Sequence, residues 1–233
     1  MQLLTATCIK SVDKDFLMCN DCNGRCVKNG STGLGKQRFR CKQCGKSHIK
    51  DYTNKACHYE LNKWICRLLK EGCGIRSISR LLRVAAATVM KRIRTIAANI
   101  KKPPVVFGQR YQLDEIRTFV KRKDNLIWIA YAIQKDTKEI IDFNIGKRTN
   151  KTLKTVVNTL VLSQAKTIST DRLKNYKYLI PPKLHRTKIY GINHIERMNL
   201  TIRTHLKRLN RRTICYSKSV AMLFACLKIY FWG

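Results

Sequence analysis

The chain has 233 residues, of which 48 are Lys or Arg and 14 are Asp or Glu, so its formal charge is +34 and its pI about 10.2. A hydrophobic content of 44% excludes a disordered basic tail and indicates one sizeable core with one or two smaller modules. The charge predicts a polyanionic partner, with nucleic acid the first candidate and a ribosomal or membrane-surface role the alternative.

The N-terminal residues indicate the cellular compartment in which we expect the protein. Residues 1–15 lack the basic start, apolar run and small-residue cleavage site of a signal peptide. We therefore expect a reducing cytoplasm, where the 11 cysteines serve as metal ligands or packed side chains more often than as disulfides. The most apolar stretch, residues 220–227, is far shorter than the ~20 residues that span a bilayer, and it predicts a buried or subunit-facing helix.

Two CxxC pairs, separated by residues 23–40, dominate the N-terminal segment. Each pair places two thiolates on one side of a tight turn, and two such turns supply a closed tetrahedral zinc site that holds a fold rather than catalyses. We predict a zinc ribbon over residues 1–55 with structural Zn²⁺ on Cys19, Cys22, Cys41 and Cys44. The alternatives are four unrelated buried cysteines, or a shifted pairing in which Cys26 replaces Cys22.

Apolar residues then recur at helical spacing in three stretches, residues 60–72, 75–83 and 85–99. Three short helices with basic residues opposite the apolar faces predict a helix-turn-helix DNA-binding domain over residues 56–100. Its DNA-contact candidates are Arg76, Arg80, Lys91, Arg92 and Arg94. The alternative is a three-helix core with a solvated basic face. Residues 101–108 begin with KKPP and predict a linker.

The pattern changes in residues 109–233. Strands are predicted at 111–120, 125–133 and 139–147, followed by a helix at 150–165, a strand at 166–171 and a late helix with apolar residues from Ile195 to Leu209. This order is that of an RNase H-like domain. The predicted fold class is therefore α+β and multi-domain: an N-terminal zinc ribbon, a helix-turn-helix, then an RNase H-like α/β catalytic domain.

Three carboxylates occupy the positions of a metal site in such a domain. Asp114 lies on the first strand, Asp171 at the end of the fourth and Glu196 on the late helix, and the last two are the only carboxylates after residue 142. Hard oxygen ligands suit two Mg²⁺ or Mn²⁺ ions that act on a phosphodiester. Glu115 should point to the opposite face of its strand and be excluded. In the alternative, Asp171 caps a helix and Glu196 pairs with Arg203.

Three segments, "LDEIRTFV", "STDRLKNYKYLIP" and "HIERMNLTIRTHLKRLNRRTICYSKS", resemble the transposases of the insertion sequence 1 family of bacterial mobile elements. The resemblance covers nearly the whole chain. It implies an Asp-Asp-Glu transposase that binds the terminal inverted repeats of its element and catalyses metal-dependent 3′-end cleavage and strand transfer. In such an enzyme Asp114, Asp171 and Glu196 would form the metal-binding triad.

The same resemblance extends to DNA contacts and partners. Arg203 would hold DNA near the metals, and Arg197 and Lys207 on the same predicted helix are further candidates. Asn193 and His194 flank the glutamate, and His185 and Lys188 match family positions before it. The expected partners are the inverted repeats and target DNA as duplexes, bound by a homodimer or larger assembly in the bacterial cytoplasm, associated with the nucleoid.

Two other functions remain open from the sequence. One is a regulator that binds the element ends but has lost catalysis, which the intact triad opposes. The other is an RNase H-like nuclease or Holliday-junction resolvase, which gives no role to a sequence-reading N-terminal half.

Overall fold

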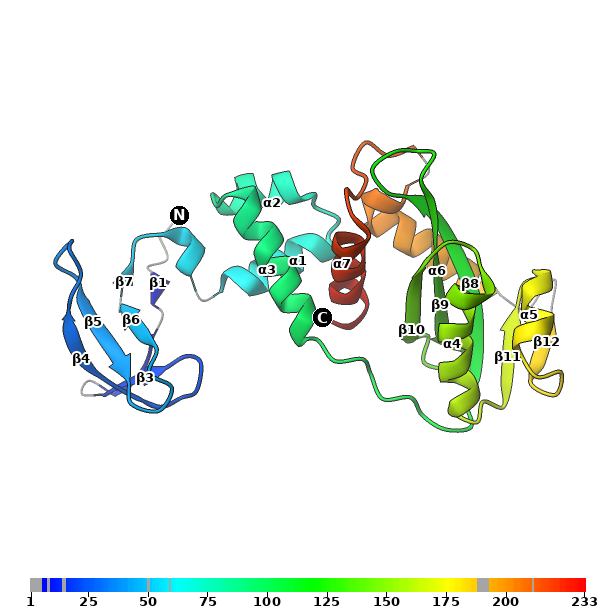
Figure 1. Cartoon of the computed structure of the whole chain (residues 1–233), viewed down its shortest axis with the longest axis horizontal. Coiled ribbons are helices and arrows are strands. Elements are labelled where there is room, and N and C mark those ends of the chain that lie inside the picture. The colour runs from blue at the N-terminus through cyan, green and yellow to red at the C-terminus, as the bar shows by residue number, and fades with distance from the viewer. Residues whose placement is uncertain are drawn as a thin grey trace.

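The computed structural model describes residues 6–7, 9–13, 16–49, 51–58, 60–187, 193–210 and 212–233. Three parts follow one another along the longest axis of this mixed α/β molecule: a small N-terminal sheet, a group of helices that includes the C-terminus, and a larger sheet flanked by helices (Figure 1). None of the helices described in these ranges has the length and apolar character needed to cross a membrane.

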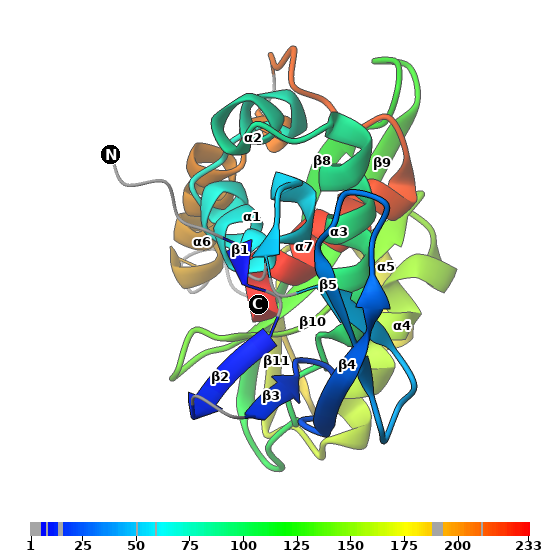
Figure 2. The ribbon, with the colours of Figure 1, turned by 90° about the vertical axis from the view of Figure 1, so that its left-hand side faces the viewer.

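The N-terminal part is an antiparallel sheet of β2 (Ile9–Asp13), β3 (Phe16–Cys19), β4 (Arg25–Ser31), β5 (Gln37–Cys41) and β6 (Ser47–Ile49) in chain order, seen from its own side in Figure 2. β1 (Ala6–Thr7) pairs separately with β7 (Asp51–Tyr52). Among the side chains that the structure describes, the buried cluster of this sheet is small: Cys19, Cys26, Phe39 and Cys41, with Leu17 against it. A core this small needs a cross-link to be stable.

Three helices follow a short 3₁₀ turn, η1 (Lys55–Cys57): α1 (Leu61–Lys70), α2 (Ile75–Leu82) and α3 (Ala86–Asn99). Each buries residues at helical spacing, such as Ile65 and Leu69 of α1 and Val89 and Ile93 of α3. The predicted stretches agree with these bounds to within two residues. The repeat of apolar residues was sufficient here because each helix has one buried face.

Helix α7 (Val220–Trp232) is shared by two cores. Met222, Cys226 and Ile229 pack with α1–α3, while Leu223 and Leu227 pack with the larger sheet. Burial on several sides explains why this segment is apolar all round. The predicted buried helix is therefore found, with contacts to both cores.

The larger sheet has the order β10-β9-β8-β11-β12. β8 (Arg110–Phe119), β9 (Leu126–Gln134) and β10 (Ile140–Gly146) are antiparallel, whereas β11 (Thr167–Thr170) runs parallel to β8 and to β12 (His185–Thr187). α4 (Asn150–Leu162) and α5 (Lys174–Leu179) pack on one face; α6 (Asn193–His205), η2 (Lys207–Leu209) and α7 cover the other (Figure 1).

The predicted elements from residue 109 to 171 agree closely with β8 to β11. Two elements were not predicted, because α5 has six residues and β12 three, too few for a period to show. Residues 181 and 182 are prolines, which cannot continue a helix, and α5 ends just before them. The late helix is shorter than predicted: α6 ends at His205, and the predicted apolar series continues through the 3₁₀ turn η2.

Candidate active site and metal centre

The separation of β8 from β11 creates the candidate active site. β11 pairs with β8 as far as Ser169 opposite Gln112, and in the part of the chain that the structure describes no strand pairs with this edge of β8 at Asp114 and Glu115. Asp114, Glu115 and Asp171 converge in the gap, with carboxylate oxygens that all lie within 4.8 Å of one another; the three residues are half-buried, and the side chain of Glu115 is only 2% exposed. This set is called the carboxylate cluster below.

Glu115 leaves β8 on the opposite face from Asp114, as strand alternation predicts, but its carboxylate joins the cluster, which corrects its expected exclusion. Its carboxylate accepts a hydrogen bond from the hydroxyl of Tyr176 on α5 and lies 3.0 Å from Nη2 of Arg148, just before α4. Asp114 is instead contacted from α6, across the sheet. The two side chains start on opposite faces of β8, and their carboxylates approach each other around the edge that β11 leaves unpaired beyond Gln112.

Asp114 is held by two donors. Nδ2 of Asn199 lies 2.6 Å from its Oδ2, and the backbone N–H of Glu115 donates to its Oδ1 across 2.7 Å. The hydroxyl of Tyr131 donates to Oδ1 of Asn199 at 2.8 Å, which fixes the orientation of the amide. Burial raises the pKa of Asp114 to about 6; the charges of Glu115 and Asp171 add to this rise, and the two hydrogen bonds oppose it.

Asp171 has a structural contact as well as a place in the cluster. Its Oδ1 accepts the backbone N–H of Leu173 at 3.0 Å and so shapes the turn before α5, whose own N-cap is Leu173 and which has no side-chain cap bond. The preceding residue, Thr170, has its hydroxyl 2.7 Å from Nε2 of His185 on β12. Burial lowers the pKa of His185, with the charge of Lys177 adding to the effect, so the imidazole is held neutral.

Glu196 is not among the carboxylates that converge. It is exposed in the first turn of α6. Asn199 follows it by three residues on the same helix face, about 4.5 Å along the axis, so Glu196 lies one turn from the group that contacts Asp114. Among the described ion pairs, Glu196 takes part in none. Arg203, its predicted alternative partner, donates from Nη1 to the carbonyl of Leu209 at 2.8 Å.

The predicted DNA-contact residues divide into exposed and structurally engaged groups. Arg92 is half-buried and donates to the carbonyl of Ala56 at 3.0 Å, which ties α3 to the segment before α1. Arg203 is engaged by its bond to the end of η2. The exposed candidates are Arg76, Arg80, Lys91, Arg94, Arg197 and Lys207. Lys188 and the side chain of Asn193 lie outside the described residues.

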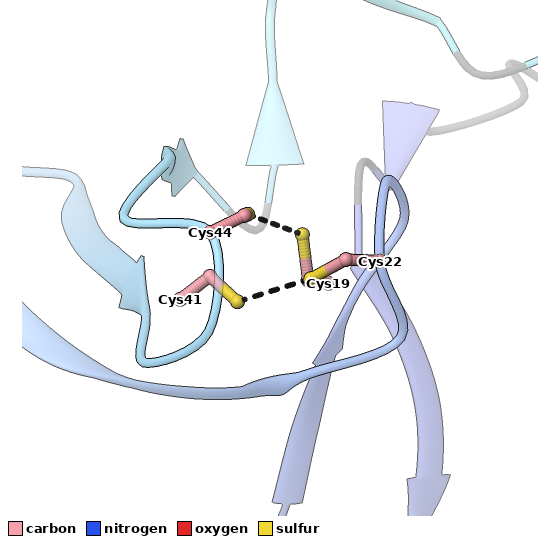
Figure 3. Close-up of side chains that lie close together, drawn as sticks. All are labelled: Cys19, Cys22, Cys41 and Cys44. Carbon is pink, nitrogen blue, oxygen red and sulfur yellow. Dashed lines mark hydrogen bonds between the residues drawn. The ribbon is translucent and has the colours of Figure 1, made fainter.

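The four predicted zinc ligands lie together (Figure 3). The Sγ atoms of Cys19 and Cys44 are 3.7 Å apart and those of Cys22 and Cys41 are 3.4 Å apart. Tetrahedral zinc with Zn–S bonds of about 2.3 Å separates its sulfurs by roughly 3.8 Å, so these thiols can hold Zn²⁺. Backbone N–H groups, first that of Cys44, lower the pKa of Cys41 to about 6 and favour the thiolate that zinc requires.

Cys26 and His48 lie next to the four predicted zinc ligands and share Cys19 with them. Nε2 of the buried His48 lies 3.2 Å from Sγ of Cys19, and Cys26 completes a second set of possible ligands. Burial raises the pKa of Cys26 to about 11, so this thiol stays protonated and packs in the core of the small sheet. A single histidine with no ligand spacing gave no signal in the sequence. Cys8, which also lacks such spacing, lies outside the described residues.

Comparison with known proteins decides the family. A family model described as IS1 transposase matches residues 110–230, just over half of the chain. The chain belongs to the IS1 transposase family. This membership implies a DDE-type enzyme that processes nucleic acid with a divalent metal. The matched range runs from β8 into α7 and therefore includes the carboxylate cluster, Glu196 and Asn199. The zinc cysteines and α1–α3 lie outside it.

Curated members of the IS1 transposase family align with about half of this chain. The "Insertion element iso-IS1n protein InsB" of Shigella dysenteriae is 35% identical over 109 residues, which are 47% of this chain and 83% of that protein. The "Insertion element IS1 protein InsB" of Shigella flexneri is 31% identical over 111 residues, 48% of this chain and 85% of that protein. A third InsB, "Insertion element IS1 4 protein InsB" of Escherichia coli K12, is 32% identical over 111 residues, 48% of this chain and 66% of that protein.

The carboxylate cluster fits the metal that this family membership implies. Mg²⁺ binds oxygen ligands at 2.0–2.1 Å, so opposite ligands lie about 4.2 Å apart, within the spread of the three carboxylates. Sequence reasoning missed Glu115 and Asn199. Asn199 had one available signal, its position three residues after Glu196, which puts both side chains on one face of α6.

Proposed function

We propose that the protein is a DNA transposase that binds the terminal inverted repeats of an insertion element and catalyses 3′-end cleavage and strand transfer. The observation that carries the proposal is the convergence of Asp114 and Asp171, with Glu115, in a chain of the IS1 transposase family. The antiparallel β8–β10, followed by α4 and a parallel β11, supports an RNase H-like arrangement of the catalytic domain.

The chemistry assigned to the chain's own residues is the binding and orientation of ligands. When bound at the cluster, divalent ions would activate the attacking oxygen and stabilise the leaving oxygen of a phosphodiester. Asp114 and Asp171 would supply the first ligands, and Glu196 would join them when DNA and metal are present. Asn199 keeps one lone pair of Asp114 engaged and so directs the other lone pairs of this carboxylate toward the site.

DNA recognition is assigned to the N-terminal half. α1–α3 fit a helix-turn-helix, and α3 presents Lys91 and Arg94 to solvent, where they can reach base edges or phosphates. Arg76 and Arg80 are exposed on α2 and suit backbone contacts. The zinc ribbon would add a further basic surface. Because two ends must be joined in transposition, we expect a homodimer or larger assembly on DNA.

The test uses the zinc-loaded protein and duplex DNA that carries the ends of its own element with their flanks. Nicks are mapped at nucleotide resolution with Mg²⁺ or EDTA for the unmodified chain, Asp114→Asn and Asp171→Asn. The acid-matched control is Asp136→Asn, an exposed residue that pairs with Arg110. We expect metal-dependent nicks at the 3′ ends from the unmodified chain and the control, with at least a thousandfold loss in the two cluster variants.

Two outcomes would contradict this proposal. End binding without nicks in any metal would favour a regulator of the element ends. Cleavage of branched DNA with no preference for the ends would favour a nuclease or resolvase.

A further inference from the structure

A second surface on the catalytic part, away from the carboxylate cluster, has the chemistry of a DNA site. It consists of the tip of the β8–β9 hairpin, residues 120–125, and the loop 212–217 that leads from η2 to α7; these lie side by side in Figure 1. Val120 and Ser217 form a parallel bridge, and the backbone N–H of Lys121 donates to the carbonyl of Ser217 at 2.9 Å. We call this surface the hairpin–loop cleft.

The base of the cleft is rigid. Ser217 is buried, and its hydroxyl accepts a hydrogen bond from Nη1 of Arg208 at 3.1 Å. Phe119 is also buried, and its ring packs against that of Tyr216 with centroids 5.5 Å apart. These contacts fix where the loop leaves the sheet, so the groups beyond them are presented in a defined place.

The rim is strongly cationic. Lys121, Arg122, Lys123 and Arg212 line it and are exposed. Asp124 is the one acid in the hairpin tip, and it lies 3.3 Å from Arg122. Among the described ion pairs, the other three cations have no carboxylate within 4 Å. Three uncompensated cations on one rim favour a polyanion with regularly spaced charges.

An apolar group stands among these cations. Ile214 is 93% exposed, and Tyr216 beside it is 39% exposed although Phe119 covers part of it. The backbone N–H of Cys215 donates to the hydroxyl of Thr213 at 2.9 Å, a local turn that sets Ile214 at the tip. Phosphate binding alone gives no reason for an exposed isoleucine, whereas proteins that distort DNA insert apolar side chains between base steps.

The cleft is connected to the candidate active site. β8 carries Asp114 at its middle and leads to Lys121 seven residues later, about 23 Å along the strand. DNA of that length holds roughly seven base pairs. Arg117 and Arg203 line a second hollow between the two sites, and Phe119 and Lys123 border both hollows. A duplex bound at the carboxylates can therefore follow a basic path to the hairpin–loop cleft.

We propose that the hairpin–loop cleft binds duplex DNA about seven base pairs from the scissile phosphate and unstacks one base step there. Lys121, Lys123 and Arg212 contact phosphates on either side, and Ile214 enters the stack with Tyr216 against the displaced base. This inference rests on the proposed function, because it takes DNA at the carboxylate cluster as its starting point. It adds a site that holds and distorts the flank of the cleaved end.

The experiment measures binding without Mg²⁺, so it does not depend on cleavage. Full-length protein is titrated with a duplex that carries an element end and 2-aminopurine at one of several positions 4–10 base pairs from the cleavage point. We expect the fluorescence of the analogue to rise severalfold at one or two adjacent positions. Ile214→Ala should abolish the rise while it weakens affinity less than threefold. Leu162→Ala, which alters an exposed leucine on α4, is the matched control and should keep the rise.

The charge contribution is measured separately. The triple variant Lys121→Ala, Lys123→Ala, Arg212→Ala should lose at least tenfold in affinity, and its slope of log affinity against log salt should fall by about 2.7. The control triple variant changes exposed lysines elsewhere, Lys154→Ala, Lys166→Ala and Lys183→Ala. Equal losses in the two triple variants would overturn the assignment of phosphate contacts to this cleft.

Two further results would overturn the proposal. One is an analogue signal that Ile214→Ala leaves unchanged. The other is an oligomer of the DNA-free protein that Ile214→Ala dissociates in sedimentation, since the apolar tip would then contact a second copy. These results are distinct from failure of the proposed function, which would appear as absence of metal-dependent nicks by a protein that still binds and distorts DNA.

Discussion

Asn199 on α6 and Asp114 on β8 are joined by a hydrogen bond of 2.6 Å, and Tyr131 on β9 orients the amide through a bond of 2.8 Å. Three elements of the C-terminal part are thus linked by a chain of two hydrogen bonds that ends at Asp114. Glu196 lies one turn before Asn199, so the same contact sets the distance of α6 from the cluster. The helix that carries the third predicted acid is positioned by a residue that is itself no metal ligand.

The first prediction concerns this contact. Asn199→Leu keeps the branched shape and the number of heavy atoms of the side chain but removes both hydrogen bonds, and the Tyr131 hydroxyl retains the carbonyl of Ile195 at 3.2 Å. We expect end binding within twofold of the unmodified chain, a cleavage rate lower by 10–100-fold, and a weaker response of cleavage to Mg²⁺ concentration. Thr201→Ala, which changes a residue bonded only to the α6 backbone, is the control. A rate within twofold in Asn199→Leu would refute the positioning role.

A second prediction follows from the raised pKa of Asp114. Its folded-state pKa of about 6 exceeds the ordinary value of 3.8, so protonation favours the folded form. The stability from this group is present below about pH 4 and is lost as pH rises through 6. Bound Mg²⁺ should reverse that loss, because it stabilises the ionised carboxylates.

The measurement is thermal unfolding of zinc-loaded protein with and without Mg²⁺, at matched ionic strength. The stabilisation by Mg²⁺ should be marked at pH 7.5 and much smaller at pH 5, where apparent affinity falls about tenfold for each pH unit below the pKa. Asp171→Asn preserves an acceptor for the Leu173 N–H and should lose the response at both values. A response equal at pH 5 and 7.5 would mean that Asp114 does not bind the ion.

The third prediction distinguishes the two possible ligand sets in the N-terminal sheet. Cys41→Ser removes one of the four converging thiols, whereas Cys26→Ser changes only the second set with His48. We expect about one zinc per chain in the unmodified protein and in Cys26→Ser, and none in Cys41→Ser. The N-terminal sheet should unfold in Cys41→Ser, because its core is too small to hold alone. Loss of zinc in Cys26→Ser, with Cys41→Ser still loaded, would reverse the assignment.

A helix or strand could be predicted from the sequence where it is long enough for its apolar residues to form a recognisable pattern. β9 could be recognised as an apolar run because both of its faces are buried: Ile129 packs with α6 and α7, and Ala130 with α4. α5 and β12 were missed because neither is long enough for a periodic pattern of apolar residues to show. Their positions depend on contacts such as that of Tyr176 with Glu115, which joins residues far apart in the chain.

The candidate site was predicted in part for a similar reason. Asp114 and Asp171 could be paired because each was placed in or directly after a strand of one predicted sheet. Glu115 was assigned to the opposite face by alternation, which its contacts with Tyr176 and Arg148 confirm, but its exclusion from the site assumed a neighbouring strand between the two carboxylates. Where β11 stops is a property of the fold and not of the residues around Glu115, so the local pattern could not show that both neighbours reach the same gap.

The last prediction concerns the contact between the three-helix part and α6. Gly72, just after α1, has φ +76°, and a Cβ placed on it would lie 2.1 Å from the carbonyl oxygen of His205 at the end of α6. Gly74, two residues later, has open space around the same position and no positive φ. The two glycines thus offer a matched pair, in which one substitution forces the backbones apart and the other does not.

We expect Gly72→Ala to lower the free energy of unfolding by more than about 2 kcal/mol, because it adds a backbone clash to the strain of a left-handed conformation. Gly74→Ala should cost less than about 1 kcal/mol, the loss of a favourable residue at the start of α2. Urea denaturation of the zinc-loaded protein measures both. Because His205 ends the helix that carries Glu196 and Asn199, Gly72→Ala should also slow cleavage at a temperature where it remains folded. Equal stability of the two variants would show that the three helices do not pack against α6 in this way.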